Sequence, residues 1–363
     1  MIRRLLLALC LSVAAAGSVA AQPASPPPAP GDESHWQEVG ATGFATKRLV
    51  LASACAEACP WGELGEFVRD AMKPAGYEII LCRNCNRTEG PRIVAEARFP
   101  PPLVDDDLRH GTVKRIKARI DFGITEASMM KWAYEGKFIY AKDGPYPNLR
   151  LIARIEDPTY LLVAVKPGLG ITSLAEIRER RLPVRILTWM QPSEAPVLDY
   201  YGLDRESLKS WGASIVTPKD VTAETPFDVI ISSLASPANN PESSFWTKLT
   251  VYHDLDYLEL PQDLRDQMVA KVDMVHTVAR WGVLPGVDRN IASVGRSGEV
   301  VFARDDMPDD MAYAAAKAID ENRGELKWFV RPYSIDPRTV GDGKGVPLHP
   351  GAARYYREKG YIK

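Results

Sequence analysis

Four cysteines in two closely spaced pairs are the side chains with the clearest chemical potential in this sequence. Cys55 and Cys59 follow one short apolar segment, and Cys82 and Cys85 follow the next. If the two segments are neighbouring parallel strands, both pairs lie at one edge of a sheet. Their spacing then permits two disulfides, which we expect to run from one loop to the other although three pairings are possible, or a four-thiolate zinc site. Redox catalysis is less favoured, because the pairs carry no further redox motif.

The N-terminus has the features of a secretory signal peptide. Arg3 and Arg4 precede a short apolar core, and small residues lead to Ala21. The core is shorter than the about 20 residues that a membrane span needs. We expect cleavage near Ala21, a Pro/Ala-rich tether over residues 22–45 and a periplasmic protein. In that oxidising compartment disulfides are a stronger expectation than zinc.

Short apolar runs alternate with amphipathic segments along the chain. Residues 48–52 are typical of a strand, 62–72 of a helix with one apolar face, and 78–81 of the next strand, a unit that builds parallel sheets. Further strands are predicted at 120–124, 149–155, 161–165, 184–187, 229–232 and 299–303, and further helices at 173–180, 194–201, 261–272 and 309–322. The pattern predicts an α/β protein, and a length of about 340 residues after the signal peptide predicts two lobes.

Charge and motifs exclude several classes of function. The formal net charge of −2 becomes −4 when Arg3 and Arg4 leave with the signal peptide, and no cluster of basic and aromatic residues indicates a nucleic-acid partner. The five histidines stand in no nucleophile, metal or acid–base motif, and the chain has no glycine-rich phosphate loop or serine elbow. We therefore expect neither an enzyme nor a bound cofactor or metal.

The C-terminal stretch 347–360, in which Pro347 and Pro350 flank His349, resembles the C-terminal signature of the TAXI family of extracytoplasmic solute receptors of TRAP transporters. Internal segments resemble the family in the same order, and they are 121–128, 134–137, 149–155, 160–165, 170–178, 201–203, 227–231, 308–313 and 321–322. The resemblance implies a two-lobed periplasmic-binding-protein fold of type II. Lobe 1 would comprise residues 46–158 and 240–363, and lobe 2 residues 159–239.

The same resemblance implies a function without catalysis. A small solute, expected to carry a carboxylate, would be held in the cleft between the lobes, where strand ends and helix amino termini converge. The closed form of a monomeric receptor would then deliver it to TRAP-type permease subunits. Two alternatives stay open: a periplasmic protein that senses a ligand and signals to a membrane sensor, and a cysteine-dependent metal-binding or redox protein.

Candidate ligand contacts come from the segments that correspond to the family's cleft. Thr125 and Ser128 could donate hydrogen bonds to an anion, whereas Glu126 could receive an amine, repel a dicarboxylate or be an exposed helix-start carboxylate. Arg280 and Trp281 could clamp a carboxylate, or form a cation–aromatic pair on the surface. The remaining candidates are Ser53, Cys55, Trp61, Thr188, Trp189, Gln191, Ser193, Ser233 and Ser236.

Two loops depart from the family pattern. Residues 53–62 carry alanines and cysteines where relatives have a Gly- and Thr-rich turn, and residues 188–194 replace a small-residue turn. Alanine and cysteine restrict the close backbone approach that glycine permits. Trp189 and Met190 could narrow the cleft or form a local apolar plug. The identity of the solute is therefore left open by the sequence.

Overall fold

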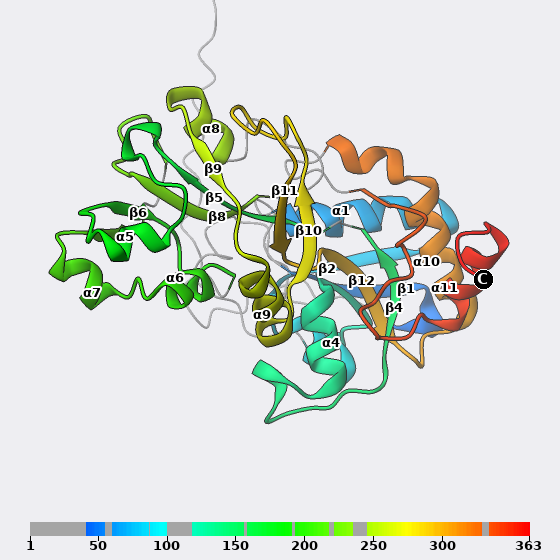
Figure 1. Cartoon of the computed structure of the whole chain (residues 1–363). Helices are drawn as coiled ribbons and strands as arrows, with labels where there is room; N and C mark the ends of the chain where they lie inside the picture. The colour runs from blue at the N-terminus through cyan, green and yellow to red at the C-terminus, as the bar shows by residue number, and fades with distance from the viewer. Residues whose placement is uncertain are drawn as a thin grey trace, which may run out of the picture.

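The computed structural model describes most of the chain after the expected signal peptide and tether (Figure 1). The described residues are 41–54, 60–86, 88–99, 118–155, 158–190, 193–217, 221–234, 245–328 and 334–363. The signal peptide and nearly all of the tether lie outside these ranges. So do four candidate residues, Cys55, Cys59, Gln191 and Ser236.

The first sheet has five strands in the order β2-β1-β3-β12-β4. Their bounds are Arg48–Ala54 for β1, Glu78–Asn86 for β2, Phe122–Glu126 for β3, Leu149–Arg154 for β4 and Glu299–Arg304 for β12. β1 runs parallel to β2 and β3, whereas β12 runs antiparallel to β3 and β4. The parallel pairing of β1 with β2 confirms the expected strand, helix, strand unit.

Helices cover both faces of the first sheet. One face packs against α1 (Pro60–Met72), α10 (Asp309–Glu321) and α11 (Pro350–Glu358), and the other against α2 (Gly90–Ala95) and α4 (Ala127–Glu135). In α1, the apolar residues Leu64, Phe67, Val68 and Met72 recur at helical spacing, and all four are buried in the core. The sheet is thus buried on both sides.

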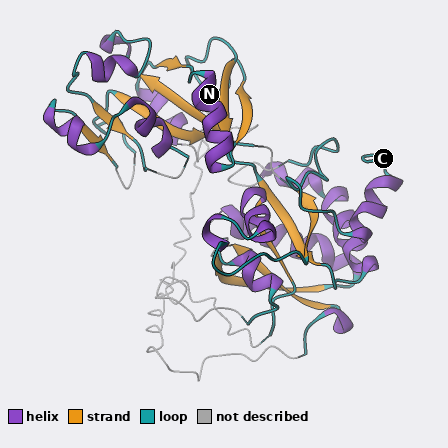
Figure 2. Ribbon diagram, turned by 60° about the horizontal axis from the view of Figure 1, so that its bottom comes forward, coloured by secondary structure: helices purple, strands orange, loops and turns teal. Residues whose placement is uncertain are grey.

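The second sheet has the order β7-β6-β8-β5-β9. The strands are β5 (Tyr160–Val165), β6 (Arg185–Leu187), β7 (Ser214–Val216), β8 (Val229–Leu234) and β9 (Asp256–Leu258). Its helices are α5 (Ala175–Glu179), α6 (Ala195–Tyr201), α7 (Arg205–Ser210), α8 (Phe245–Tyr252) and α9 (Gln262–Val272). The two sheets with their covering helices form two lobes, as Figure 2 shows, and confirm the expected two-lobed α/β fold.

Two crossing segments connect the lobes. One lies between the end of β4 at Arg154 and the start of β5 at Tyr160, and the other, residues 295–298, leads from the hairpin of β10 (Val275–Ala279) and β11 (Ile291–Gly295) into β12. An added Cβ on Gly295 would lie 1.6 Å from the carbonyl oxygen of Thr159, so only glycine lets the two crossings touch. The hairpin runs between the two sheets (Figure 1).

β9 pairs with β5, so residues 256–258 belong to the second sheet. Buried residues of α8, such as Trp246, share a core with Leu162 of β5, and Leu264 of α9 shares another core with Leu161. A return to lobe 1 at residue 240, as the sequence predicts, is therefore too early. We propose that lobe 2 continues to the crossing at 295–298.

The C-terminal motif packs against lobe 1, as expected. His349 has an extended backbone, is fully buried and caps α11, and its Nδ1 accepts a hydrogen bond from the N–H of Gly351 at 3.3 Å. A Cβ on Gly351 would lie 1.9 Å from the carbonyl oxygen of Asp309, so glycine is needed there too. The buried hydroxyl of Tyr356 donates to the carbonyl of Ile152 in β4 at 3.0 Å.

Short 3₁₀ helices complete the described elements. They are η1 (Phe44–Thr46), η2 (Lys73–Ala75), η3 (Phe138–Tyr140), η4 (Pro167–Leu169) and η5 (Arg323–Trp328). Within the described ranges, no helix combines the length and the apolar character that a bilayer crossing would require.

Candidate functional site

The sheet edges that carry polar side chains are turned toward the crossing segments. Glu126 ends β3 and pairs with Glu299, the residue that opens β12 directly after one crossing. Leu234 ends β8 and pairs with Tyr160, the residue that opens β5 directly after the other. Both edges hold the carboxyl ends of parallel strands, where α/β proteins bind their ligands. The region between the lobes is therefore the candidate site.

On lobe 1, the turn from β3 into α4 is tied to the crossing at 295–298. The N–H of Ser128 donates to Oγ of Ser297 at 2.8 Å, and the two hydroxyls are also 2.8 Å apart. The N–H of Ala127 donates to the carbonyl of Gly298 at 2.9 Å. Two of the first N–H groups of α4 are thus already paired within the protein.

Glu126 is buried, 6 % exposed, which rules out an exposed helix-start carboxylate. Its Oε1 accepts from the N–H of Ser297 at 3.4 Å, and its Oε2 lies 3.9 Å from a guanidinium nitrogen of Arg296. Thr125 and Ser128 are buried as well. A carboxylate, a guanidinium and three hydroxyls therefore gather where β3, α4 and the crossing meet.

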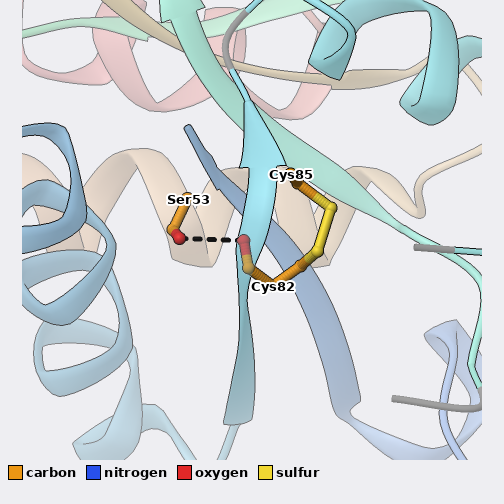
Figure 3. The surroundings of a disulfide bond; sticks show 3 residues. All are labelled: Ser53, Cys82 and Cys85. Atoms are coloured by element: carbon orange, nitrogen blue, oxygen red, sulfur yellow. Dashed lines mark hydrogen bonds between the residues drawn. A yellow bond between two sulfur atoms is a disulfide. The ribbon is translucent and has the colours of Figure 1, made fainter. Parts of the chain in front are cut away.

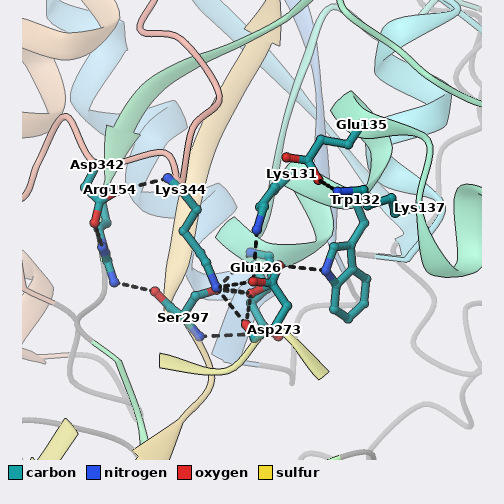
Figure 4. A network of polar contacts seen from close by, with 11 residues as sticks. Glu126, Lys131, Trp132, Glu135, Lys137, Arg154, Asp273, Ser297, Asp342 and Lys344 are labelled. Atoms are coloured by element: carbon teal, nitrogen blue, oxygen red, sulfur yellow. Dashed lines mark hydrogen bonds and ion pairs between the residues drawn. The ribbon is translucent and has the colours of Figure 1, made fainter. Parts of the chain in front are cut away.

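Asp273 connects lobe 2 to this cluster (Figure 4). It ends α9 in the left-handed region, with φ at 56°, and Met274 next to it belongs to the lobe 2 core. Its carboxylate oxygens accept from Nζ of Lys131 at 3.0 Å and from Nε1 of Trp132 at 2.8 Å, both on α4, and Nζ of Lys344 lies 3.0 Å away. We name the group formed by Asp273, Lys131, Trp132 and Lys344 the interlobe bridge.

Backbone and hydroxyl contacts reinforce the interlobe bridge. Nζ of Lys344 donates to the carbonyl of Asp273 at 2.6 Å and to Oγ of Ser128 at 3.2 Å. Burial alone would raise the pKa of Asp273, but hydrogen bonds from Lys344 and Lys131 outweigh it and hold this pKa below its usual range. Burial also lowers the pKa of Lys344, although Asp273 opposes this. The lobes are thus joined by a partly buried ion pair.

Next to the interlobe bridge, Arg154 fixes the crossing from the side of β4. Its guanidinium donates to the carbonyl of Ser297 at 2.5 Å and to the carboxylate of Asp342 at 2.8 Å. The Arg154 side chain is 6 % exposed, whereas that of Asp342 is 54 % exposed. Because a buried guanidinium requires such partners, this contact holds the backbone of Ser297 in place.

On lobe 2, a buried carboxylate lies between the ends of β6 and β8. Glu194, immediately before α6, accepts from Oγ1 of Thr188 at 2.9 Å and from the N–H of Trp189 at 3.0 Å through one oxygen. Its other oxygen accepts from Oγ of Ser232 at 2.7 Å. Oγ of Ser193 lies 3.4 Å from Oγ of Ser233 at the same edge. The expected residues Thr188, Trp189, Ser193 and Ser233 do come together here.

The cysteines form a different arrangement from the expected one. Cys82 and Cys85 are joined to each other by a disulfide within β2, so these two do not pair with Cys55 or Cys59 in the other loop (Figure 3). Two sulfurs held in a disulfide also cannot serve as thiolate ligands of zinc. Across the part of the chain that is described, no group of three His, Cys, Asp or Glu side chains could hold a metal ion.

The remaining candidates are Ser53, Trp61, Arg280 and Trp281. Oγ of buried Ser53 donates to the carbonyl of Cys82 at 2.9 Å, which links β1 to β2 (Figure 3). Trp61 lies in the first turn of α1. Arg280 and Trp281 are both exposed at the tip of the β10–β11 hairpin, Trp281 by 71 %, whereas the other end of the hairpin meets the crossing. The proposed clamp of Arg280 and Trp281 is therefore not brought to the candidate site.

Sequence reasoning missed the interlobe bridge, Ser297 and the structural use of Glu194. For Glu194 a weak signal existed, since it opens the predicted helix 194–201, but that position does not indicate a buried carboxylate. Asp273 and Lys344 gave none, since neither stands in a motif and each contacts residues far away in the chain.

Several solved structures and one family model are similar to this chain. A TctC solute-binding protein from Polaromonas is similar with a TM-score of 0.44 and 13 % identity, over 87 % of this chain and 98 % of that one. MatC from Rhodopseudomonas palustris with bound malate has a TM-score of 0.39 and 13 % identity, over 86 % and 97 %. A second R. palustris protein, with adipate, has a TM-score of 0.39 and 12 % identity, over 86 % and 96 %. The model of the NMT1-like family matches residues 112–360, more than half of the sequence, and this chain belongs to that family.

Proposed function

We propose that this chain is an extracytoplasmic solute-binding receptor that holds a small, carboxylate-bearing solute between its lobes and delivers it to a TRAP-type permease. Membership of the NMT1-like family supports the proposal. The observation that carries it is the concentration of buried polar side chains at the two sheet edges that border the crossing segments, with Glu126 and Ser128 on lobe 1 and Thr188 and Glu194 on lobe 2. Polar residues that only stabilise one lobe would not need a counterpart at the edge of the other lobe.

Within the NMT1-like family, the ordered internal segments and the buried His349 turn favour a TAXI-type receptor, though a divergent one. The altered loops at 53–62 and 188–194 are the basis for calling it divergent. The N-terminal sequence supports export to the periplasm with cleavage near Ala21. No catalytic step is proposed.

Recognition would depend on the two crossing segments. A solute that contacts the sheet edges of both lobes stabilises the closed form of the receptor. A membrane partner can distinguish this closed form from the solute-free form. Arg296, at 3.9 Å from Glu126 and partly exposed, is the guanidinium of the lobe 1 cluster and the proposed partner of the solute carboxylate. Ser128, Ser297 and Thr125 would position it.

Calorimetric titration of the mature protein with small carboxylates, sulfonates and amino acids tests the proposal. For the acid that binds, Arg296→Gln should weaken affinity about tenfold or more, because a charge-assisted hydrogen bond is lost. Arg338→Gln, at an exposed arginine on lobe 1, is the matched control and should leave affinity unchanged. Equal affinity of wild type and Arg296→Gln would refute the assigned contact, and the lack of any binding acid would refute the function.

The permease is tested separately. Membrane vesicles that contain the TRAP-type permease subunits encoded nearest to this chain should accumulate the labelled solute only when the mature protein is added. Accumulation that is independent of the protein would contradict the delivery role.

A further inference from the structure

The carboxylate of Glu194 fills a complete set of oxyanion donors on lobe 2. Two hydroxyls and one backbone N–H, from Thr188, Ser232 and Trp189, converge on it within 3.0 Å. All three donors are neutral; Thr188 and Trp189 directly follow β6, and Ser232 lies in β8. Glu194 itself is 2 % exposed.

This is the arrangement that a site for a solute carboxylate would have. Hydroxyls and backbone N–H groups that point at one position bind carboxylates through charge-assisted hydrogen bonds. Burial of a carboxylate without such donors would be costly, so the donors explain how Glu194 stays buried. The same donors cannot serve two carboxylates at once. A second anion near this edge would also be repelled by the negative charge of Glu194, and burial weakens the screening of that repulsion.

We propose that Glu194 is a specificity-determining residue, an internal carboxylate that occupies the oxyanion donors of lobe 2 and so restricts the receptor to solutes with a single carboxylate. The proposal rests on the solute-binding function. The carboxylate of the solute is held by Arg296 on the lobe 1 side, where the guanidinium also offsets the charge of Glu126. The three donors named at Glu194 include no such cation, so the group that faces lobe 2 is uncharged or positively charged. A dicarboxylate, whose second carboxylate would meet Glu194, is discriminated against.

Chemical rescue tests the occupied donor set without knowledge of the natural solute. In Glu194→Ala the donors lose their internal partner, and sodium acetate should raise the melting temperature saturably. Sodium chloride at equal ionic strength should not, and the rise with acetate should exceed any rise that acetate causes in wild type. In the double variant Glu194→Ala with Ser232→Ala, one donor is missing and the acetate effect should weaken several-fold. A Glu194→Ala protein that responds to acetate no more than wild type would overturn the proposal.

The discrimination itself is measured with butyrate and succinate, which match in chain length and differ by one carboxylate. In wild type, butyrate should bind at least about tenfold more tightly than succinate, and Glu194→Gln, which keeps shape and removes charge, should reduce this ratio. A wild-type preference for succinate, or an unchanged ratio in Glu194→Gln, would overturn the proposal.

If neither acid binds, the solute-binding function fails for these acids, while the rescue experiment still decides whether Glu194 fills a carboxylate site. Should Glu194→Ala not fold, the Glu194→Gln ratio decides alone.

Discussion

The interlobe bridge should contribute measurably to stability, and Asp273→Asn tests this with the smallest change in shape. The substitution removes the charge that faces Lys131 and Lys344 but keeps an oxygen for the N–H of Trp132. Removing one partner of a fully buried ion pair costs about 3–5 kcal/mol, whereas exposed pairs contribute about 0–1 kcal/mol. The side chains of Asp273 and Lys344 are 13 % and 11 % exposed, and that of Lys131 is 25 % exposed. We therefore expect a loss of about 2 kcal/mol in the free energy of unfolding.

Urea unfolding at pH 7 in low salt measures that loss. The matched control is Glu78→Gln, which removes the charge from the exposed pair of Glu78 with Arg48 and should cost less than about 1 kcal/mol. Hydrogen exchange should also become faster in α4 and in residues 342–346, because the bridge joins both to α9. If Asp273→Asn costs no more than Glu78→Gln and leaves exchange unchanged, the bridge does not hold the lobes together.

The pH dependence of the same variant follows from the lowered pKa of Asp273. Because the folded state holds this carboxylate in its charged form, the stabilisation is present above the unfolded pKa of about 3.9 and is lost as the pH falls through the lower folded pKa. The stability difference between wild type and Asp273→Asn should therefore be constant from pH 5 to 7 and shrink below about pH 4. A difference that persists unchanged at pH 2.5 would contradict the electrostatic explanation.

Three further predictions concern groups outside the candidate site. Burial raises the pKa of Asp121 to about 6, so the fold loses stability as the pH rises from about 4 to about 6, where the unfolded carboxyl is ionised and the folded one is still protonated. Asp121→Asn should therefore be more stable than wild type by about 2 kcal/mol at pH 8 and equal to it at pH 3.5, and a pH-independent difference in thermal unfolding would refute this. Peptide mapping without reduction should recover Cys82 linked to Cys85, and a peptide that links either to another cysteine would refute the pairing. Tyr356→Phe removes a buried hydrogen bond and should cost about 1 kcal/mol in urea unfolding, whereas no loss would show that the tail helix does not depend on it.

Local patterns predicted the framework of the fold well. The helical spacing of Leu64, Phe67 and Val68 placed α1, and the alternation of apolar runs with helices gave the parallel start of the first sheet. The three-residue strands β7 and β9 and the five-residue strands β10 and β11 were missed. β7 and β9 are too short to show periodicity, although the equally short β6 was predicted from its apolar residues. The missed β9 explains why the predicted return to lobe 1 came too early.

The candidate site was predictable only where its residues stand in recognisable turns. Ser128 and Thr188 follow buried strands, so their position at a sheet edge could be anticipated. Asp273 contacts Lys131 and Lys344, which are 142 and 71 positions away, and only the folded chain brings them together. The disulfide partner of Cys82 could not be predicted either, since spacing allows three pairings.

Thermal unfolding of the mature protein with and without a panel of small monocarboxylates tests the central claim most directly. A solute that binds only the folded chain stabilises it by about 2.7 kcal/mol at a concentration of one hundred times its dissociation constant. We predict that at least one monocarboxylate raises the melting temperature saturably by several degrees, and that Arg296→Gln, with affinity about tenfold weaker, reduces this rise by about half or more at the same concentration. No stabilisation by any member of the panel, at concentrations up to several millimolar, would contradict the account.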